Sequence, residues 1–198
     1  MKMLKWLSIL LISCTALSAC SFTPYSPKIA EIGNAGSTTG PHIIKRMTVT
    51  DTNSGRSSFA YGAVSSYPGA SADIGRIGIP KKVEGYWSKG WDEYEEYYYI
   101  SSLIDSKLAE NKIDTLRDYY KNHGDYMAAM VLAVDGPRVR LIYTLNCFAK
   151  FNDCAPRKNA DPNGWVVRSP DDTTEVVVLF DGTGEASDTP FPGSPYDK

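Results

Sequence analysis

The sequence predicts an α+β fold, with a mostly antiparallel β-sheet and one main helix packed on a face of it. Short segments rich in β-branched and aromatic residues alternate with turn residues, which is the pattern of strands joined by hairpins. One stretch after Ser102 has helical spacing instead, and Gly124 ends it. With 198 residues, 42% of them hydrophobic, one globular domain is the expected organisation.

Four segments in the first half have the composition of strands. The first two alternate apolar and polar residues on either side of the turn 51–55, and this predicts a hairpin. A glycine-containing loop over 65–80 follows, and two segments rich in Tyr, Trp and Val then flank the turn 88–90. The four predicted strands are 42–50, 57–64, 81–87 and 93–100.

The second half begins with the predicted helix. Ser102 or Asp105 can cap it, and we expect about five turns, with a possible kink near Asn111. Apolar residues recur along it at helical spacing: Ile104, Leu108, Ile113, Leu116 and Tyr120. The helix is therefore expected to bury one face.

Four more strands are predicted after the helix. The apolar segment 127–134 and the segment 139–145 form a hairpin about Asp135-Gly136-Pro137. Because 127–134 has almost no polar face, we expect it in the centre of the sheet. The last two strands are 165–168 and 175–180.

Residues 1–19 predict a lipoprotein signal peptide. Lys2 and Lys5 precede an apolar run that is too short to span a bilayer as a stable helix. The run ends in Leu17-Ser18-Ala19-Cys20, which resembles the lipobox of bacterial lipoproteins. The resemblance implies lipidation at Cys20, and Ser21 after it favours an outer-membrane address facing the periplasm. The alternative is an ordinary signal peptide or an apolar helix with a coincidental cysteine.

Composition sets the predicted boundaries of the globular domain. Residues 20–41 are rich in Pro, Gly, Ser and Thr and predict a lipidated flexible tether. Residues 42–186 are the predicted globular domain. Residues 187–198 predict a loose tail, although Phe191 and Tyr196 offer side chains that can pin it to the domain.

Charge and residue counts exclude several classes of function. The 21 Lys and Arg residues against 23 Asp and Glu residues give a formal net charge of −2, which provides no field for nucleic acid. Two histidines and four cysteines without C-x-x-C spacing argue against a zinc module, and we expect neither a metal site nor a cofactor.

The mature chain keeps two cysteines in addition to Cys20, namely Cys147 and Cys154. In an oxidising periplasm they predict a structural disulfide. Two free thiols or a redox pair are the alternatives, although the spacing differs from that of C-x-x-C redox motifs.

No familiar catalytic motif occurs in the chain. A Ser-His-Asp triad would have to use His42 or His123, and we interpret both as structural or solvated. The carboxylates Asp92, Glu93, Glu95 and Glu96 could pair for glycoside hydrolysis, but neighbouring charges like these are typical of a solvated strand edge. The sequence therefore predicts a binding protein and not an enzyme.

Residues 86–99 are the most unusual stretch, with seven aromatic residues among fourteen. Because a strand buries only alternate side chains, some rings must face outward, where Tyr and Trp are typical of interfaces. Interleaved carboxylates suit a basic partner surface. The predicted partner-binding residues are Trp91, Tyr94, Glu95, Glu96 and Tyr98. Alternatively, Tyr97 and Tyr99 pack under the helix and the other rings lie at the surface without a partner, or the rings stack on sugars.

Three motifs together carry a family resemblance. With the lipobox, a tyrosine-rich strand and a helix, the motifs Ile79–Val83, Gly85–Lys89 and Met130–Leu141 resemble small enterobacterial lipoproteins encoded beside type VI secretion phospholipase effectors. The similarity covers about residues 75–145. It implies an immunity protein that is anchored in the periplasm and neutralises a lipase toxin.

Two other classes of function remain open. One is an envelope lipoprotein that binds peptidoglycan glycan or an outer-membrane assembly partner, and the other is a hydrolase with an unrecognised site. A lipase reading frame next to the gene would favour the immunity protein. His42 or His123 within hydrogen-bond reach of a Ser and an Asp would favour the hydrolase.

The lipobox predicts that Cys20→Ser releases the protein from the membrane fraction, because burial of the acyl chains is what holds it there. Fractionation and sedimentation of both forms measure this. Unchanged sedimentation of the variant with membranes contradicts the prediction.

The cysteine pair predicts that Cys147 and Cys154 resist alkylation in the unreduced, denatured mature protein. Mass spectrometry before and after reduction measures the number of reactive thiols. Alkylation of both residues without reduction would rule out the disulfide.

Overall fold

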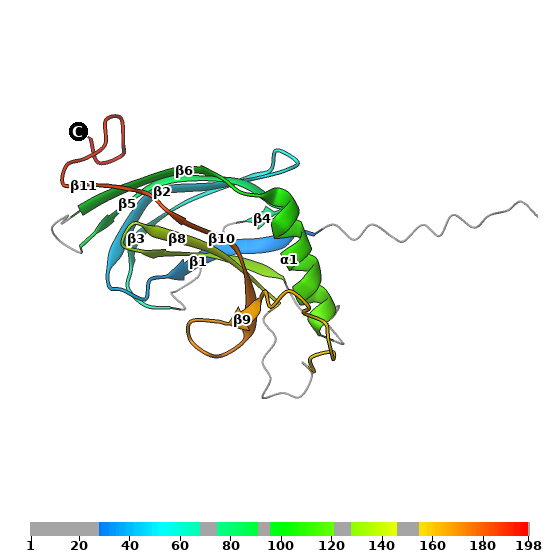
Figure 1. The fold of residues 1–198 in the computed structure, drawn as a ribbon. Coiled ribbons are helices and arrows are strands. Elements are labelled where there is room, and N and C mark those ends of the chain that lie inside the picture. Colours follow the sequence, from blue (N-terminus) through cyan, green and yellow to red (C-terminus); the bar gives the residue numbers. More distant parts are fainter. Residues whose placement is uncertain (1–27, 68–74, 91–95, 121–127, 146–154, 198) are drawn as a thin grey trace, which may run out of the picture.

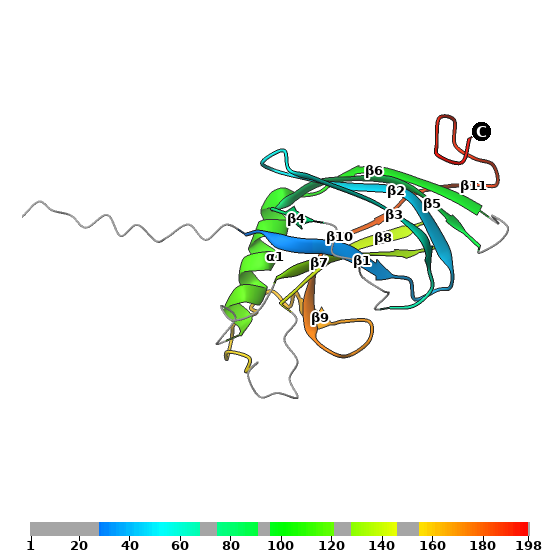
Figure 2. The same cartoon turned by 180° about the vertical axis from the view of Figure 1, so that it is seen from behind.

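A computed structural model describes residues 28–67, 75–90, 96–120, 128–145 and 155–197, and every structural statement below concerns these residues. They contain 53% strand and one helix, arranged as two packed sheets that are largely antiparallel (Figures 1 and 2). The α+β class is confirmed, although the strands form two sheets and not one.

The first sheet, sheet A, has the order β4-β1-β7-β8-β10-β9. Its strands are β1 (Ala30–Gly36), β4 (Arg76–Ile77), β7 (Ala129–Asp135), β8 (Arg138–Thr144), β9 (Val166–Arg168) and β10 (Glu175–Thr183). The predicted hairpin of β7 and β8 forms with Asp135 opposite Arg138, and both strands lie in the middle of the sheet, as expected for so apolar a segment.

The second sheet, sheet B, has the order β11-β6-β5-β2-β3. Its strands are β2 (His42–Asp51), β3 (Arg56–Val64), β5 (Pro80–Lys89), β6 (Glu96–Leu103) and β11 (Glu185–Ser187). The β2–β3 hairpin forms where the sequence predicts it. The Asp51 carboxylate holds the turn, because it accepts the backbone N–H groups of Asn53 and Gly55 at 2.9 and 2.6 Å.

The helix α1 (Ser106–Tyr119) is shorter than predicted. Of the two possible caps, Asp105 is the one used, and its carboxylate accepts the Leu108 N–H at 2.9 Å. Ala109, Ile113 and Leu116 are buried against the core. The helix ends before Gly124 because Tyr120 is already extended, with φ −99° and ψ 144°, and pairs with Pro156. In both views α1 lies across one end of the sheets.

The predicted tether, residues 20–41, is wrong in its second half. Residues 30–36 form β1, which pairs in parallel with β7, and Ala30 and Ile32 are buried in the core. The segment 20–41 is predicted as flexible from its Gly and Thr content, although it contains two apolar side chains that face the core. The described globular part therefore begins before residue 42.

The predicted tail is fixed by the two residues that the sequence offered for this purpose. Residues 185–187 form β11 against β6, and Phe191 and Tyr196 then contact tyrosines of sheet B. The Tyr196 hydroxyl donates to the Ile43 carbonyl at 2.8 Å. The segment 188–197, called the C-terminal segment below, is therefore part of the folded domain.

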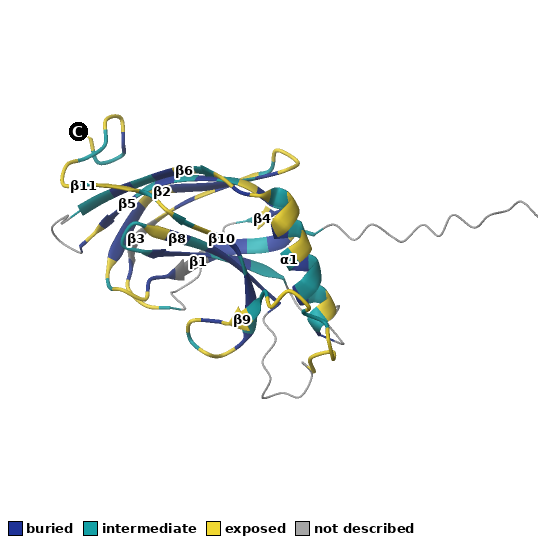
Figure 3. Cartoon of the chain, in the orientation of Figure 1, coloured by how far each residue is buried: buried dark blue, intermediate teal, exposed yellow. Residues whose placement is uncertain are grey.

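The core lies between the two sheets. Buried apolar side chains from both sheets and from α1 form one cluster, and Figure 3 shows that burial follows the strands while the turns are mostly exposed. No described helix has the length and apolar character needed to cross a membrane. The chain passes between the two sheets at several points, among them from β1 to β2 and from β10 through Gly184 to β11.

Gly184 predicts a destabilising substitution at the β10–β11 crossing. A Cβ at this position would lie 2.5 Å from the Tyr99 carbonyl oxygen and 2.8 Å from the Trp87 ring. We expect Gly184→Ala to lower the free energy of unfolding by about 1–3 kcal/mol, the usual cost of overpacking. Denaturant unfolding measures it, with Ala186→Ser at an exposed position of β11 as the control. Equal midpoints for wild type and Gly184→Ala would contradict the prediction.

Candidate functional site

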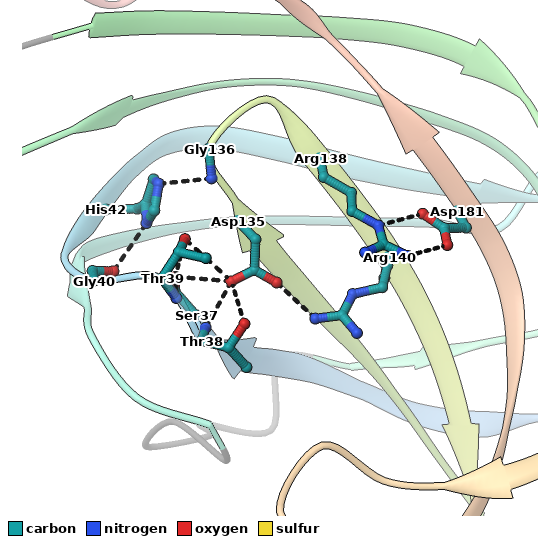
Figure 4. Close-up of polar contacts among 10 residues, drawn as sticks. All are labelled: Ser37, Thr38, Thr39, Gly40, His42, Asp135, Gly136, Arg138, Arg140 and Asp181. Atoms are coloured by element: carbon teal, nitrogen blue, oxygen red, sulfur yellow. Dashed lines mark hydrogen bonds and ion pairs between the residues drawn. The ribbon is translucent and has the colours of Figure 1, made fainter.

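The β1–β2 crossing closes around the side chain of Asp135 (Figure 4). One carboxylate oxygen accepts the Thr38 N–H at 2.6 Å, the Thr38 hydroxyl at 2.9 Å and the Ser37 hydroxyl at 3.1 Å. The other accepts the Arg140 guanidinium at 2.6 Å, and the side chain is only 8% exposed. Burial acts to raise the pKa of Asp135, but the hydrogen bonds outweigh it and the pKa is lowered. The charged Asp135 side chain therefore holds the β1–β2 crossing against the end of β7.

His42 bridges the same crossing to the β7–β8 turn (Figure 4). Its Nδ1 lies 2.9 Å from the Gly40 carbonyl, and its Nε2 lies 3.0 Å from the Gly136 nitrogen. This pattern assigns the proton to Nδ1, because Nε2 must accept the Gly136 N–H. The ring is 1% exposed, and burial lowers its pKa. Both ring nitrogens are used by the backbone, so His42 does not serve a neighbouring serine as a base.

A depression of about 350 Å³ lies beside this network on the outer face of sheet A. One part of its wall is polar, from Thr38, Thr39, Asp135, Arg138, Arg140 and Arg168, and the other is apolar, from Ile142, Val167, Pro170, Val176 and Val178. The depression has the hydrogen-bonding groups and the apolar surface of a binding site for a small molecule.

Carboxylates already pair with the arginines of the depression. Arg138 makes a two-bond contact with Asp181, at 2.7 and 2.5 Å, and this contact lowers the pKa of Asp181. Arg168 lies 3.4 Å from the Glu175 carboxylate, and Arg140 binds Asp135. An anionic ligand would have to displace these partners. The charges around the depression are therefore balanced within the chain, and they stabilise the β1–β2 crossing. The described residues contain no cluster of three metal-ligating side chains.

A second surface, called the tyrosine row below, lies on the outer face of sheet B. It consists of the half-buried Tyr86, Tyr97 and Tyr99. Tyr86 and Tyr99 stack with ring centroids 4.6 Å apart, and the Arg46 guanidinium lies over Tyr86 at 4.9 Å. Phe191 of the C-terminal segment packs on Tyr86 and Tyr99.

The C-terminal segment contacts all three tyrosines of the row. Phe191 lies 6.5 Å from Tyr86 and 5.8 Å from Tyr99, and Tyr196 meets Tyr97 edge to face at 5.2 Å. Side chains from β5, β6 and the C-terminal segment thus form one aromatic surface.

The prediction that Tyr98 is a surface anchor is wrong. Tyr98 is 1% exposed, stacks on Trp87 at 5.4 Å and donates from its hydroxyl to Glu96 at 2.5 Å. The alternative in which Tyr97 and Tyr99 pack under the helix is wrong as well, since both face outward in the row. Glu96 is half-buried at the start of β6 and holds the Tyr98 hydroxyl.

The other residues singled out from the sequence lie outside the described residues. They are Cys20, Trp91, Asp92, Glu93, Tyr94, Glu95, His123, Cys147 and Cys154. Residues 91–95 connect β5 to β6, so their sequence position is next to the strands that carry the tyrosine row.

Several important residues escaped sequence reasoning. The sequence predicts Asp135 only as part of a turn and Arg46 only as a strand residue, and it places Tyr86 in the aromatic stretch 86–99 without predicting it as a binding residue. Asp135 binds Ser37 and Thr38 about a hundred residues earlier, and Arg46 lies over Tyr86 from a separate strand, so these contacts have no local signal in the sequence. Phe191 and Tyr196 did give a signal, since two aromatic residues in a Pro-rich tail are expected to find a surface.

The comparisons with known proteins assign no relative. Neither the protein-family models, nor the curated proteins, nor the solved structures contain a match to this chain. The function must therefore be inferred from the chain's own residues.

His42 predicts a loss of stability on acidification. The fold lowers the pKa of His42, so on acidification the unfolded chain takes up the proton before the folded protein does. The contribution of His42 to the free energy of unfolding is therefore fully present above about pH 6.5 and decreases below it. We expect the free energy of unfolding to fall between pH 6.5 and 5, by at most about 1.4 kcal/mol per pH unit. Denaturant unfolding across this range measures it.

The matched control is His42→Gln, whose amide can donate and accept but does not titrate there. The free energy of unfolding of the variant is subtracted from that of wild type at each pH. This subtraction removes the contributions of Asp135 and Lys89, which face His42, and of all other titrating groups. Parallel stability profiles for wild type and variant would show that His42 is not the cause.

Proposed function

We propose that this chain is a periplasm-facing lipoprotein that binds and neutralises a secreted antibacterial toxin, a type VI phospholipase effector. The tyrosine row is the observation that carries the proposal. It places half-buried aromatic side chains on the face of a sheet whose strands β5 and β6 are joined in the sequence by the aromatic-acidic segment 91–95. Aromatic side chains of this kind supply most of the binding energy in many protein interfaces.

Packing from below supports the row as a binding surface. Trp87 and Tyr98 stack beneath the sheet, and the Trp87 indole donates to the Gly136 carbonyl at 2.7 Å. The rings of the row are held from above by Phe191 and Tyr196. A surface that is ordered before binding loses little conformational entropy when a partner arrives, which favours tight inhibition.

Carboxylates that adjoin the row in the sheet or in the sequence suit a partner with a basic surface. Glu96 begins β6, Glu185 is exposed opposite Tyr99 on β11, and four consecutive connection residues include three carboxylates, Asp92, Glu93 and Glu95. Carboxylates at the rim of an interface steer a cationic partner and speed its association. Lys45 and Arg46 contact Tyr196 and Tyr86, so these cations are engaged by the row itself.

Stacking on glycan is the second candidate for the same rings, because Tyr86 and Tyr99 are partly exposed. A sugar needs a free ring face. The Tyr86 ring already stacks on Tyr99 and carries the Arg46 guanidinium, so the geometry favours a protein partner over a sugar.

The direct test is binding of the purified mature protein to the lipase encoded by a neighbouring gene, with lipase activity as the second readout. We expect a stable complex and inhibition of lipid hydrolysis. Binding to peptidoglycan fragments without binding to the lipase would replace the proposal with the glycan candidate.

The aromatic anchors predict where the affinity lies. Trp91→Ala and Tyr94→Ala should each weaken toxin binding by about 2 kcal/mol, the usual scale of an interface hot spot. Titration calorimetry measures this, and Val167→Ala, an exposed apolar position on β9, is the control. Tyr98→Ala is not a valid probe, because it removes a buried ring. Wild-type affinity in both anchor variants would place the interface elsewhere.

The carboxylates predict an effect on association rather than dissociation. Reversal of Glu95 and Glu96 to Lys should slow binding, and less so at high salt because ions screen the attraction. Stopped-flow or surface-binding kinetics measure both rates. Glu96→Gln is the control for Glu96→Lys, since either change alters the acceptor of the Tyr98 hydroxyl but only one reverses the charge. A salt-independent association rate in wild type would contradict the steering role.

A further inference from the structure

We infer that the α1 end of the domain lies on the bilayer that holds the Cys20 lipid, with Ile29, Leu103 and Leu108 in contact with the membrane interface. The inference rests on the lipid anchor of the proposed function and not on the toxin. It commits to one partner, the membrane surface itself. The tyrosine row would then lie on the part of the domain that extends away from the bilayer.

The first step is where the chain enters the folded domain. The Lys28 ammonium donates to Glu110 at 2.9 Å and to Asp114 at 2.7 Å, and its side chain is only 18% exposed. Both carboxylates belong to α1. The first described residue is therefore held against the helix, and β1 begins two residues later.

The second step is the reach of the link. Seven residues, 21–27, separate Cys20 from Lys28, and a chain of this length spans at most about 28 Å in any conformation. The α1 end therefore stays close to the membrane. Strand β5 starts at Pro80, whose carbonyl accepts the Ser106 hydroxyl of α1, and its ten residues extend about 30 Å from there.

The third step is the placement of exposed apolar side chains. Among the described residues, four large apolar side chains are exposed, and three of them belong to the α1 end: Leu103 at 74%, Ile29 at 50% and Leu108 at 37%. Leu103 immediately precedes the helix, Leu108 is in its first turn, and Ile29 follows the clamped Lys28. The fourth, Val167, lies on β9. The interfacial region of a bilayer is the natural environment for such side chains.

The fourth step is charge. Lys81 and Lys107 are exposed at the same end, and Lys107 keeps 77% of its side chain exposed although it pairs with Glu110 at 3.1 Å. The Lys81 carbonyl accepts the Ile104 N–H at 2.8 Å, which places Lys81 beside Leu103, and Lys107 precedes Leu108 in the helix. Exposed lysines next to apolar side chains are typical of surfaces that rest on anionic headgroups. The apolar and cationic groups thus combine on the end that the link already holds near the lipid.

The opposite end has a different character. The β5 strand ends at Lys89 near the β7–β8 turn, where Trp87 binds Gly136, and the C-terminal segment covers Tyr97 there. In both views the C-terminal end and α1 lie at opposite sides of the sheets. A partner arriving from the periplasm would meet the tyrosine row before it meets α1.

The test uses the full lipidated chain in vesicles of phosphatidylethanolamine and phosphatidylglycerol that contain nitroxide-labelled lipid. A fluorophore is attached at Asn111→Cys on α1 or at Asp188→Cys, both exposed positions, and wild type treated with the dye reports labelling of native cysteines. We expect the lipid to quench the fluorophore at 111 several-fold more strongly than the one at 188. Equal quenching, or stronger quenching at 188, would overturn the inference. Release of the wild-type protein by an alkaline wash would overturn it together with the anchor.

The contact residues are tested in the same vesicles. Leu103→Ser with Leu108→Ser should reduce quenching at 111, and Val167→Ser should leave it unchanged. Unchanged quenching in the double variant would show that these leucines do not contact the bilayer. Toxin binding in detergent solution is measured separately and should be unaffected by the double variant. Failure to bind toxin there counts against the proposed function, whereas the quenching result counts only for or against the orientation.

Discussion

The β7–β8 turn is the point on which the two sheets depend. The backbone of Gly136 is held from both sides, since its N–H donates to His42 and its carbonyl accepts the Trp87 indole. Both of these side chains come from sheet B, whereas the turn belongs to sheet A. A buried polar group that loses its partner costs more than a made hydrogen bond contributes, so this junction must be complete for the fold to close.

The same requirement explains the neighbouring charges. Asp135 is nearly buried, and it stays ionised because the Ser37 and Thr38 donors and Arg140 replace its water. Two buried polar atoms of the described residues, the Arg140 Nε and the Ser88 hydroxyl oxygen, have no such partner. Ser88 lies opposite Tyr97 in the sheet, and Arg140 forms part of the wall of the depression.

The junction also connects the support of the fold to the proposed binding surface. Trp87 is in contact with the turn on one side and with Tyr98 on the other, and this stack sets which face of β6 is buried. Tyr97 and Tyr99 must then face outward, where the C-terminal segment meets them. In the proposed orientation, α1 would lie on the membrane and these rings would face the periplasm at the other end. One end of the domain would then bind the membrane and the other would bind the toxin.

Local patterns in the sequence were sufficient for much of the fold. The Asp105 cap, the helical spacing of Ile113 and Leu116, and the apolar run before Asp135-Gly136-Pro137 each depend on neighbouring residues, and all three formed as expected. Only the tertiary structure decided that Ala30 and Ile32 enter a sheet, because parallel pairing with β7 joins segments about a hundred residues apart. It also decided that Tyr98 is buried while Tyr97 and Tyr99 are not. Alternation along a strand states only that neighbours point to opposite faces, and the choice of face comes from register against Trp87, a contact that no local pattern contains.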